Sequence, residues 1–134
     1  MTTLHERALL DTSVVIHYPA SDVAAHALTA AVSTITLAEL SYGLHTGDPL
    51  LNAAREQRYH WIVNTFDPIP FDLQAARIYG ALCANVRAVG RDPKPRRFDL
   101  LIAAVAVALA IPLITRNEGD FIGIHDRLTI IAVG

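Results

Sequence analysis

Short apolar segments alternate with longer helix-forming segments along this chain of 134 residues. The segments expected to be strands are rich in β-branched residues and leucine: 7–10, 32–36, 68–71, 112–115 and 128–133. The segments expected to be helices lie between them: 12–18, 23–31, 37–45, 49–66, 73–89 and 98–110. Short apolar strands separated by helices are typical of a parallel sheet covered on both faces. The sequence therefore predicts an α/β fold with a central, mainly parallel sheet.

The composition narrows the class of protein. Hydrophobic residues make up 52% of the chain, which indicates a globular protein, and the length suits a single domain over residues 1–134. The formal net charge of −2 excludes a strongly basic nucleic-acid binder, so any contact with RNA must come from a local basic patch. The single cysteine, Cys83, excludes an intramolecular disulfide framework and fits a reducing compartment.

The N-terminal sequence shows no cationic region followed by a long apolar one, so we expect no signal peptide. The longest apolar run, 100–114, is shorter than the roughly 20 residues that span a bilayer. Pro112 also divides this run into a helix and a strand. We therefore expect a cytoplasmic protein that makes no membrane contact.

Four acidic residues stand where apolar segments begin or end. They are Asp11, after the first expected strand, Glu39 and Asp99, in the first turns of helices, and Asp120, after the fourth expected strand. Sites in open parallel sheets form beyond the carboxyl ends of the strands, so the fold can gather these side chains. Gathered carboxylates repel one another, and a hard divalent cation relieves that repulsion. The pattern predicts a Mg²⁺ or Mn²⁺ site that acts on phosphate.

Each of these acids also has a purely structural explanation. Asp11 and Asp99 could cap the helices that follow them, and the helix dipole could favour Glu39. Asp120 could be a turn aspartate. The chain has 13 acidic residues, and all four of these adjoin apolar segments. A shared role is therefore the preferred interpretation.

Four segments of the sequence resemble the PIN-domain family, and more narrowly the VapC-type ribonuclease toxins of type II toxin–antitoxin pairs. The matching segments follow the family's order along the chain: LLDTS at 9–13, TLAEL at 36–40, FDLLIAA at 98–104 and TRNEGDF at 115–121. The resemblance implies a three-layer α/β/α fold and a Mg²⁺- or Mn²⁺-dependent endoribonuclease. It also implies a homodimer and a cognate antitoxin, for which the helices 50–66 and 73–89 offer apolar surfaces.

The resemblance further assigns roles to individual residues. The acidic quartet would be Asp11, Glu39, Asp99 and Asp120, and its polar supports would be Ser13, Thr115 and Asn117. We expect Asp11 and Asp99 to be the main ligands of one or two metal ions. The other two acids would complete the metal shell or orient the attacking water.

A basic loop lies immediately before Asp99. Its cations are Arg91, Lys94, Arg96 and Arg97. They could clamp RNA phosphates beside the acids, or they could simply be solvated. Arg116 is a second candidate, either for a phosphate contact or for pairing within the protein.

Two other functions remain open at this point. An aspartate after a strand also occurs in phosphotransferases that form an aspartyl phosphate, but these need a lysine at a later strand end. The only lysine here, Lys94, lies in a proline-rich loop. The other alternative is a non-catalytic PIN-like binding module that keeps the acids for partner binding or metal-dependent folding. RNA cleavage that EDTA abolishes would distinguish the nuclease from both.

Overall fold

The first strand, β1, occupies the centre of a five-stranded sheet in which every pairing is parallel. The computed structural model describes residues 3–134. In the sheet order β3-β2-β1-β4-β5, the strands are β1 His5–Leu10, β2 Ala27–Ser33, β3 Asp67–Ile69, β4 Leu113–Thr115 and β5 Ile130–Ala132. The helices are α1 Thr12–Val15, α2 Ala20–Ala24, α3 Thr34–Tyr42, α4 Pro49–Thr65, α5 Leu73–Ala88 and α6 Arg97–Leu109. Two 3₁₀ turns, η1 Lys94–Arg96 and η2 Glu118–Phe121, flank α6 and β4.

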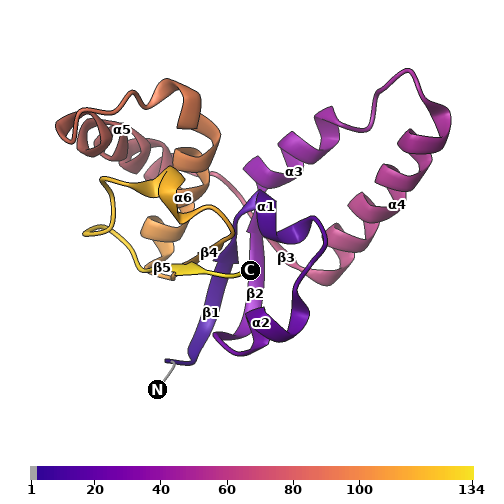
Figure 1. Ribbon diagram of the computed structural model, residues 1–134, viewed down its shortest axis with the longest axis horizontal. Coiled ribbons are helices and arrows are strands. Elements are labelled where there is room, and N and C mark those ends of the chain that lie inside the picture. Colours follow the sequence, from indigo (N-terminus) through magenta and orange to yellow (C-terminus); the bar gives the residue numbers. More distant parts are fainter. Residues whose placement is uncertain (1–2) are drawn as a thin grey trace.

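Helices cover both faces of this sheet, which confirms the three-layer α/β/α fold. Because side chains alternate along a strand, Leu9 and Leu10 enter different cores. Leu9 packs in the core that contains side chains of α5, α6 and η2, and Leu10 packs in the core that contains side chains of α1 and α4. Figure 1 shows α5 and α6 on one side of the strands and the hairpin of α3 and α4 on the other.

The order in which successive strands join the sheet changes direction at β1. The chain proceeds from β1 to β2 and β3 on one side, and then crosses over to β4 and β5 on the other. Leu10 of β1 pairs with Val32 of β2 and Ile114 of β4, so the carboxyl ends of these three strands lie together. Such a reversal leaves a crevice beyond the strand ends in an open parallel sheet. Asp11 lies at this point in the present fold.

Local sequence signals placed most helices correctly. Asp48 and Asp72 accept hydrogen bonds from the first turns of α4 and α5, as their positions before these helices predicted. Pro49 occupies the first position of α4, where its missing N–H costs no hydrogen bond. The apolar segment predicted as 98–110 forms α6, which starts one residue earlier.

The predicted helix 23–31 is wrong. The helix α2 ends at Ala24, and residues 27–31 belong to β2, where they pair with β1. Asp22, which the sequence suggested as the N-cap of the predicted helix, lies inside the first turn of α2, and the N-cap position is Pro19. Alanine favours helix in isolation, but pairing with a buried strand overrides that preference. The strand predicted at 32–36 also ends three residues too late, because β2 ends at Ser33.

The helix that follows β2 also begins earlier than expected. Ser33 ends β2 and caps α3, with its hydroxyl accepting a hydrogen bond from the Thr36 N–H at 3.3 Å. The β-branched residues 34–36, predicted to be strand, therefore form the first turn of α3. The helix predicted at 12–18 is also shorter, since α1 ends at Val15.

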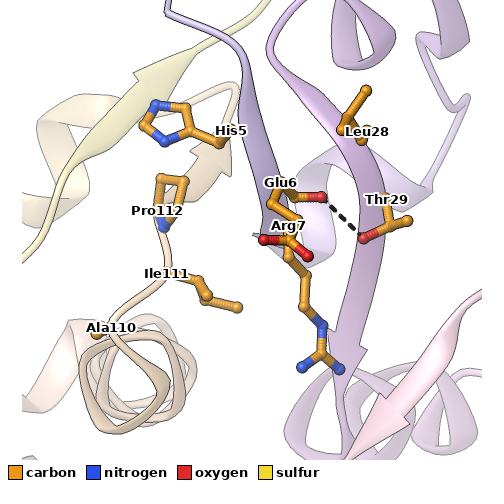
Figure 2. A pocket seen from close by; sticks show the side chains of 8 residues that line it. All are labelled: His5, Glu6, Arg7, Leu28, Thr29, Ala110, Ile111 and Pro112. Carbon is orange, nitrogen blue, oxygen red and sulfur yellow. Dashed lines mark hydrogen bonds between the residues drawn. The ribbon is translucent and has the colours of Figure 1, made fainter.

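The opposite, amino edge of the sheet has its own cavity. It measures about 580 Å³ and is lined by residues of β1 and β2 and by the segment before β4, including His5, Arg7, Leu28 and Pro112. Figure 2 shows the Thr29 hydroxyl donating to the Glu6 carbonyl beside it, at 3.1 Å. This cavity lies at the amino ends of the strands, remote from Asp11, so substitutions there can act as controls for substitutions near Asp11. Within residues 3–134, no helix is long and apolar enough to cross a membrane.

One glycine after η2 is required by the packing of α5. Gly123 has a φ of +106°, and a Cβ there would lie 3.0 Å from Val89 Cγ2 and 3.3 Å from the Asn85 carbonyl oxygen. Both the backbone conformation and the close approach disfavour any side chain.

We predict that Gly123→Ala lowers the free energy of unfolding by about 1–3 kcal/mol, because it combines backbone strain with overpacking. Gly80 is the matched control: it lies on α5 with open space around its Cα. Gly80→Ala should raise the free energy of unfolding by about 0.5–1 kcal/mol, because alanine favours the helix. Urea denaturation of both variants measures these changes, and equal stability of the two would contradict the assignment.

Candidate functional site

The carboxylate of Asp11 is the most constrained group at the carboxyl edge of the sheet. Its side chain is 3% exposed and caps α1, with Oδ1 accepting from the Thr12 N–H at 2.8 Å. Oδ2 accepts from the hydroxyls of Thr115, at 2.7 Å, and Ser13, at 3.0 Å. Burial raises the pKa of Asp11, the three hydrogen bonds oppose that rise, and the charge of Asp120 adds to it. The capping role and a site role are therefore compatible.

Glu39 joins this site through Thr12. The Thr12 hydroxyl donates to Glu39 Oε1 at 2.8 Å and lies 3.0 Å from the hydroxyl of Thr36. Since the single Thr12 proton is used toward Glu39, Thr36 is the donor in the second bond. Partial burial raises the pKa of Glu39, the Thr12 bond lowers it, and the charge of Asp11 raises it further.

Asp99 experiences the charges of all three other acids. Burial and then repulsion from Asp11, Asp120 and Glu39 raise its pKa to about 7. Arg96 is the cation that opposes this rise. The fold thus brings Asp11 from the end of β1, Glu39 from α3 and Asp120 from η2 within electrostatic range of Asp99 on α6. That these four acids form one functional site stays a prediction.

The predicted polar supports differ in what they contribute. Thr115 is fully buried at the end of β4 and donates to Asp11. Ser13 donates to the same oxygen and accepts from the backbone N–H of Arg116 at 3.3 Å. Asn117 is exposed and uses its backbone N–H, which donates to the Thr115 hydroxyl at 3.0 Å. The resemblance gave Asn117 a supporting role, and the contact observed here is made by its backbone.

Sequence reasoning missed two residues of this network. Thr12 connects Asp11 to Glu39, and Thr36 is fully buried and bonded to Thr12. The available signals were a hydroxyl directly after Asp11 and another three residues before Glu39. Three residues is about one helical turn, so Thr36 and Glu39 share a face of α3.

The basic residues near the acids make mainly backbone contacts. Arg91 donates to the Gly119 carbonyl at 2.8 Å, which ties the basic loop to η2. Arg116 donates to the carbonyls of Ser13, at 3.1 Å, and His17, at 2.8 Å, so it is paired within the protein.

Three cations of the basic loop remain on or near the surface. Lys94 and Arg97 are exposed, and Arg96 is half-buried. Within residues 3–134, the Nε of Arg96 is the one buried side-chain polar atom that has no hydrogen-bond partner. A role for these residues and Arg116 in RNA binding stays a prediction.

The donor chemistry of the four acids fits a hard divalent cation. Within residues 3–134, no three His, Cys, Asp or Glu side chains form a ready-made metal site. Mg²⁺ keeps several water ligands and commonly takes only one or two carboxylates from a protein. Carboxylates that raise one another's pKa supply the oxygen donors and negative charge that such an ion requires.

We predict that Asp99→Asn stabilises the metal-free protein at neutral pH. The raised pKa means that ionised Asp99 opposes folding, so the parent loses stability as the pH rises from about 4 to about 7. Relative to the parent, the free energy of unfolding of the variant should be higher by about 1–2 kcal/mol above pH 7 and unchanged near pH 3. The expected gain is smaller than the full pKa shift would give, because water screens this partly exposed group.

Urea denaturation in EDTA across this pH range tests the prediction. Asp126→Asn, in an exposed turn, is the control for the same change of charge. A gain of the same size at pH 3 and pH 8 would contradict the electrostatic explanation.

Comparison with known proteins agrees with this geometry. A family model described as the PIN domain matches residues 8–124. Ribonuclease VapC5 of Mycobacterium tuberculosis is 33% identical over 135 residues, which cover 97% of this chain and 96% of that protein. The crystal structure of VapBC-5 from the same organism, a member of the VapBC family of toxin-antitoxin systems, matches with a TM-score of 0.80 and 31% identity. That match covers 95% of this chain and 98% of the other.

Two further structures extend the comparison. A toxin-antitoxin complex from Klebsiella pneumoniae matches with a TM-score of 0.64 and 28% identity over 87% of this chain and 92% of the other. VapBC2 from Rickettsia felis, bound to a promoter DNA fragment, has the same fold at 24% identity, with a TM-score of 0.77 over 96% of this chain and 99% of the other. Because the PIN model covers most of the chain and VapC5 matches along nearly its whole length, the chain belongs to the PIN-domain family and, within it, to the VapC-type proteins.

Proposed function

We propose that this chain is a Mg²⁺- or Mn²⁺-dependent endoribonuclease and the toxin of a toxin–antitoxin pair. One observation carries the proposal: at the carboxyl edge of the sheet, the charges of Asp11, Glu39 and Asp120, from three separate elements, all act on Asp99. The likeness to a protein named Ribonuclease VapC5 supports RNA as the substrate. The likeness to VapBC-5 supports a cognate antitoxin as the partner.

In this proposal Asp11 and Asp99 are the main metal ligands. A divalent cation held by Asp11 and Asp99 would supply a water molecule of lowered pKa and would offset the negative charge that develops on the phosphate. Asp11 is held in one orientation by Thr12, Ser13 and Thr115, so its direction does not depend on the metal. Such fixed orientation avoids reorganisation during the reaction.

Glu39 and Asp120 have the supporting roles. Thr12 holds one oxygen of Glu39, at 2.8 Å, and thereby couples the position of Glu39 to that of Asp11. Glu39 and Asp120 complete the ligand set or orient the attacking water. The hydroxyl of Thr36, which bonds to Thr12, keeps this part of α3 in place.

The surface offers places where partners can dock. Leu50 on α4 and Leu73 on α5 are more than four-fifths exposed, at 83% and 81%. Exposed apolar side chains on long helices suit contacts with another protein chain. We assign the α4 and α5 surfaces to a second copy of the chain or to the antitoxin.

We predict that Asp11→Asn reduces RNA cleavage by roughly 100-fold or more while the fold is retained, because several kcal/mol of transition-state stabilisation depend on the metal. Cleavage by the parent should stop in EDTA and return with Mg²⁺ or Mn²⁺. Gel analysis of a labelled RNA measures the rates, and circular dichroism checks the fold. The matched control is Asp126→Asn, which should cleave like the parent. An Asp11→Asn protein that cuts RNA at the parental rate would refute the assignment.

A second prediction concerns the basic loop. Replacing Arg96 and Arg97 together by glutamate should weaken RNA binding and make it less sensitive to salt. For single-stranded RNA the slope of log K against log salt should fall by about 0.7 for each phosphate that the protein no longer neutralises. The control pair is Arg77→Glu with Arg87→Glu, on the exposed face of α5. If the variant with both Arg96 and Arg97 replaced bound RNA with unchanged affinity and salt slope, these arginines would not contact RNA phosphates.

A further inference from the structure

Two exposed aromatic side chains lie beside Glu39. Tyr42, the last residue of α3, is 89% exposed, and Phe98, near the start of α6, is 46% exposed. Together with Ala38 and Glu39 they line an open cavity of about 420 Å³. Glu39 thus belongs both to this cavity and to the carboxylate cluster, which makes the two sites continuous.

The helices place both rings next to the acids. Tyr42 follows Glu39 by three residues and shares its face of α3. Phe98 directly precedes Asp99. A single exposed apolar residue is ordinary on a protein surface, but two rings that line one cavity offer flat faces on which another ring can stack.

The charges around the cavity indicate what it can accept. The guanidinium of Arg97 lies over the Phe98 ring, 5.6 Å from its centroid. Arg96 is close enough to lower the pKa of Asp99. The carboxylate of Glu39 repels a phosphate from the cavity itself, whereas the arginines attract one to its border. A nucleotide satisfies both conditions, with its neutral base among the rings and its phosphate near the arginines.

We infer that Tyr42 and Phe98 form a stacking subsite for one unpaired nucleobase next to the cleaved phosphate. The inference rests on the proposed function and adds to it a contact with one base of the bound RNA. Bases are available for stacking on aromatic side chains only where the RNA is unpaired. A peptide of a partner protein is the competing occupant: Glu39 would attract an arginine or lysine in it, whereas Arg96 and Arg97 would repel one, so the binding test below has to separate the two occupants.

The test is a double-mutant cycle, in which removal of a ring from the protein is combined with removal of a base from the RNA. Fluorescence anisotropy measures Kd in the Asp11→Asn background for a labelled single-stranded RNA and for a series in which each nucleotide in turn is abasic. One abasic position should weaken binding roughly 5- to 100-fold, the range expected for loss of one stacked base. Tyr42→Ala or Phe98→Ala should weaken binding of the intact RNA similarly, and the abasic change should then cost little more.

Two control variants separate stacking from other effects. Tyr42→Phe keeps the ring and should bind both RNAs like the parent. Leu28→Ala removes a side chain that is 68% exposed at the amino edge of the sheet and should have no effect (Figure 2). Both aromatic residues are exposed, so thermal unfolding of the alanine variants should match the parent.

The possible outcomes distinguish this inference from the proposed function. If the parent cleaves RNA but the alanine variants bind intact and abasic RNA as tightly as the parent, the subsite is refuted and the nuclease stands. If the same variants lose only antitoxin affinity, the cavity is a protein-docking site and the subsite is refuted. If the parent does not cleave RNA with either metal, the proposed function fails and the inference fails with it.

Discussion

The hydrogen bonds to the buried Asp11 carboxylate organise the carboxyl edge of the sheet. A carboxylate that is 3% exposed is costly to ionise unless donors surround it, and Thr12, Ser13 and Thr115 are those donors. Two of them follow β1 and one ends β4, so the same bonds also join the two strands at the reversal of the sheet. The site and this part of the fold therefore share their stabilising contacts.

Asp11 and the acids around it repel one another. Burial and mutual charge raise the pKa of Asp11, Glu39 and Asp99, and the hydroxyl bonds offset this only in part. Such tension is typical of sites selected for binding or chemistry rather than for stability. A divalent cation would relieve it, and the supporting bonds are made entirely within the protein. Asp11 and Glu39 are thus oriented by the protein itself, although the residues described here do not form a closed metal cage.

The two edges of the sheet differ in chemistry. The carboxyl edge carries acids, hydroxyls, exposed aromatic rings and arginines, contributed by α1, α3, η1, α6 and η2. At the amino edge, the larger cavity is lined by strand residues and by Pro112, and none of the four acids lies there. Of these two cavities, size alone would favour the amino edge. The chemistry of the lining groups and the direction of the strands favour the carboxyl edge, where we propose the site.

The strand–helix alternation and the helix caps at Asp48 and Asp72 could be predicted from the sequence, because these features depend on residues that are near one another in the chain. The grouping of the four acids was expected from the topology of parallel sheets and from the resemblance to the PIN-domain family. The end of α2 could not, because residues 27–31 become a strand only through pairing with β1, and alanine by itself favours helix. The same limit applied to Thr36, whose role depends on Thr12, 24 residues away in the chain.

By itself, the sequence determined which chemical groups are present and, for α4, α5 and α6, on which kind of element they lie. The tertiary structure decided which of them meet: it placed Thr115 against Asp11 across 104 positions of sequence, and it turned Arg116 toward backbone carbonyls. It also left Tyr42 and Phe98 uncovered beside Glu39. The physical reason is that hydrogen bonds, repulsion and burial act over a few ångströms in space, whereas sequence patterns report only neighbours along the chain.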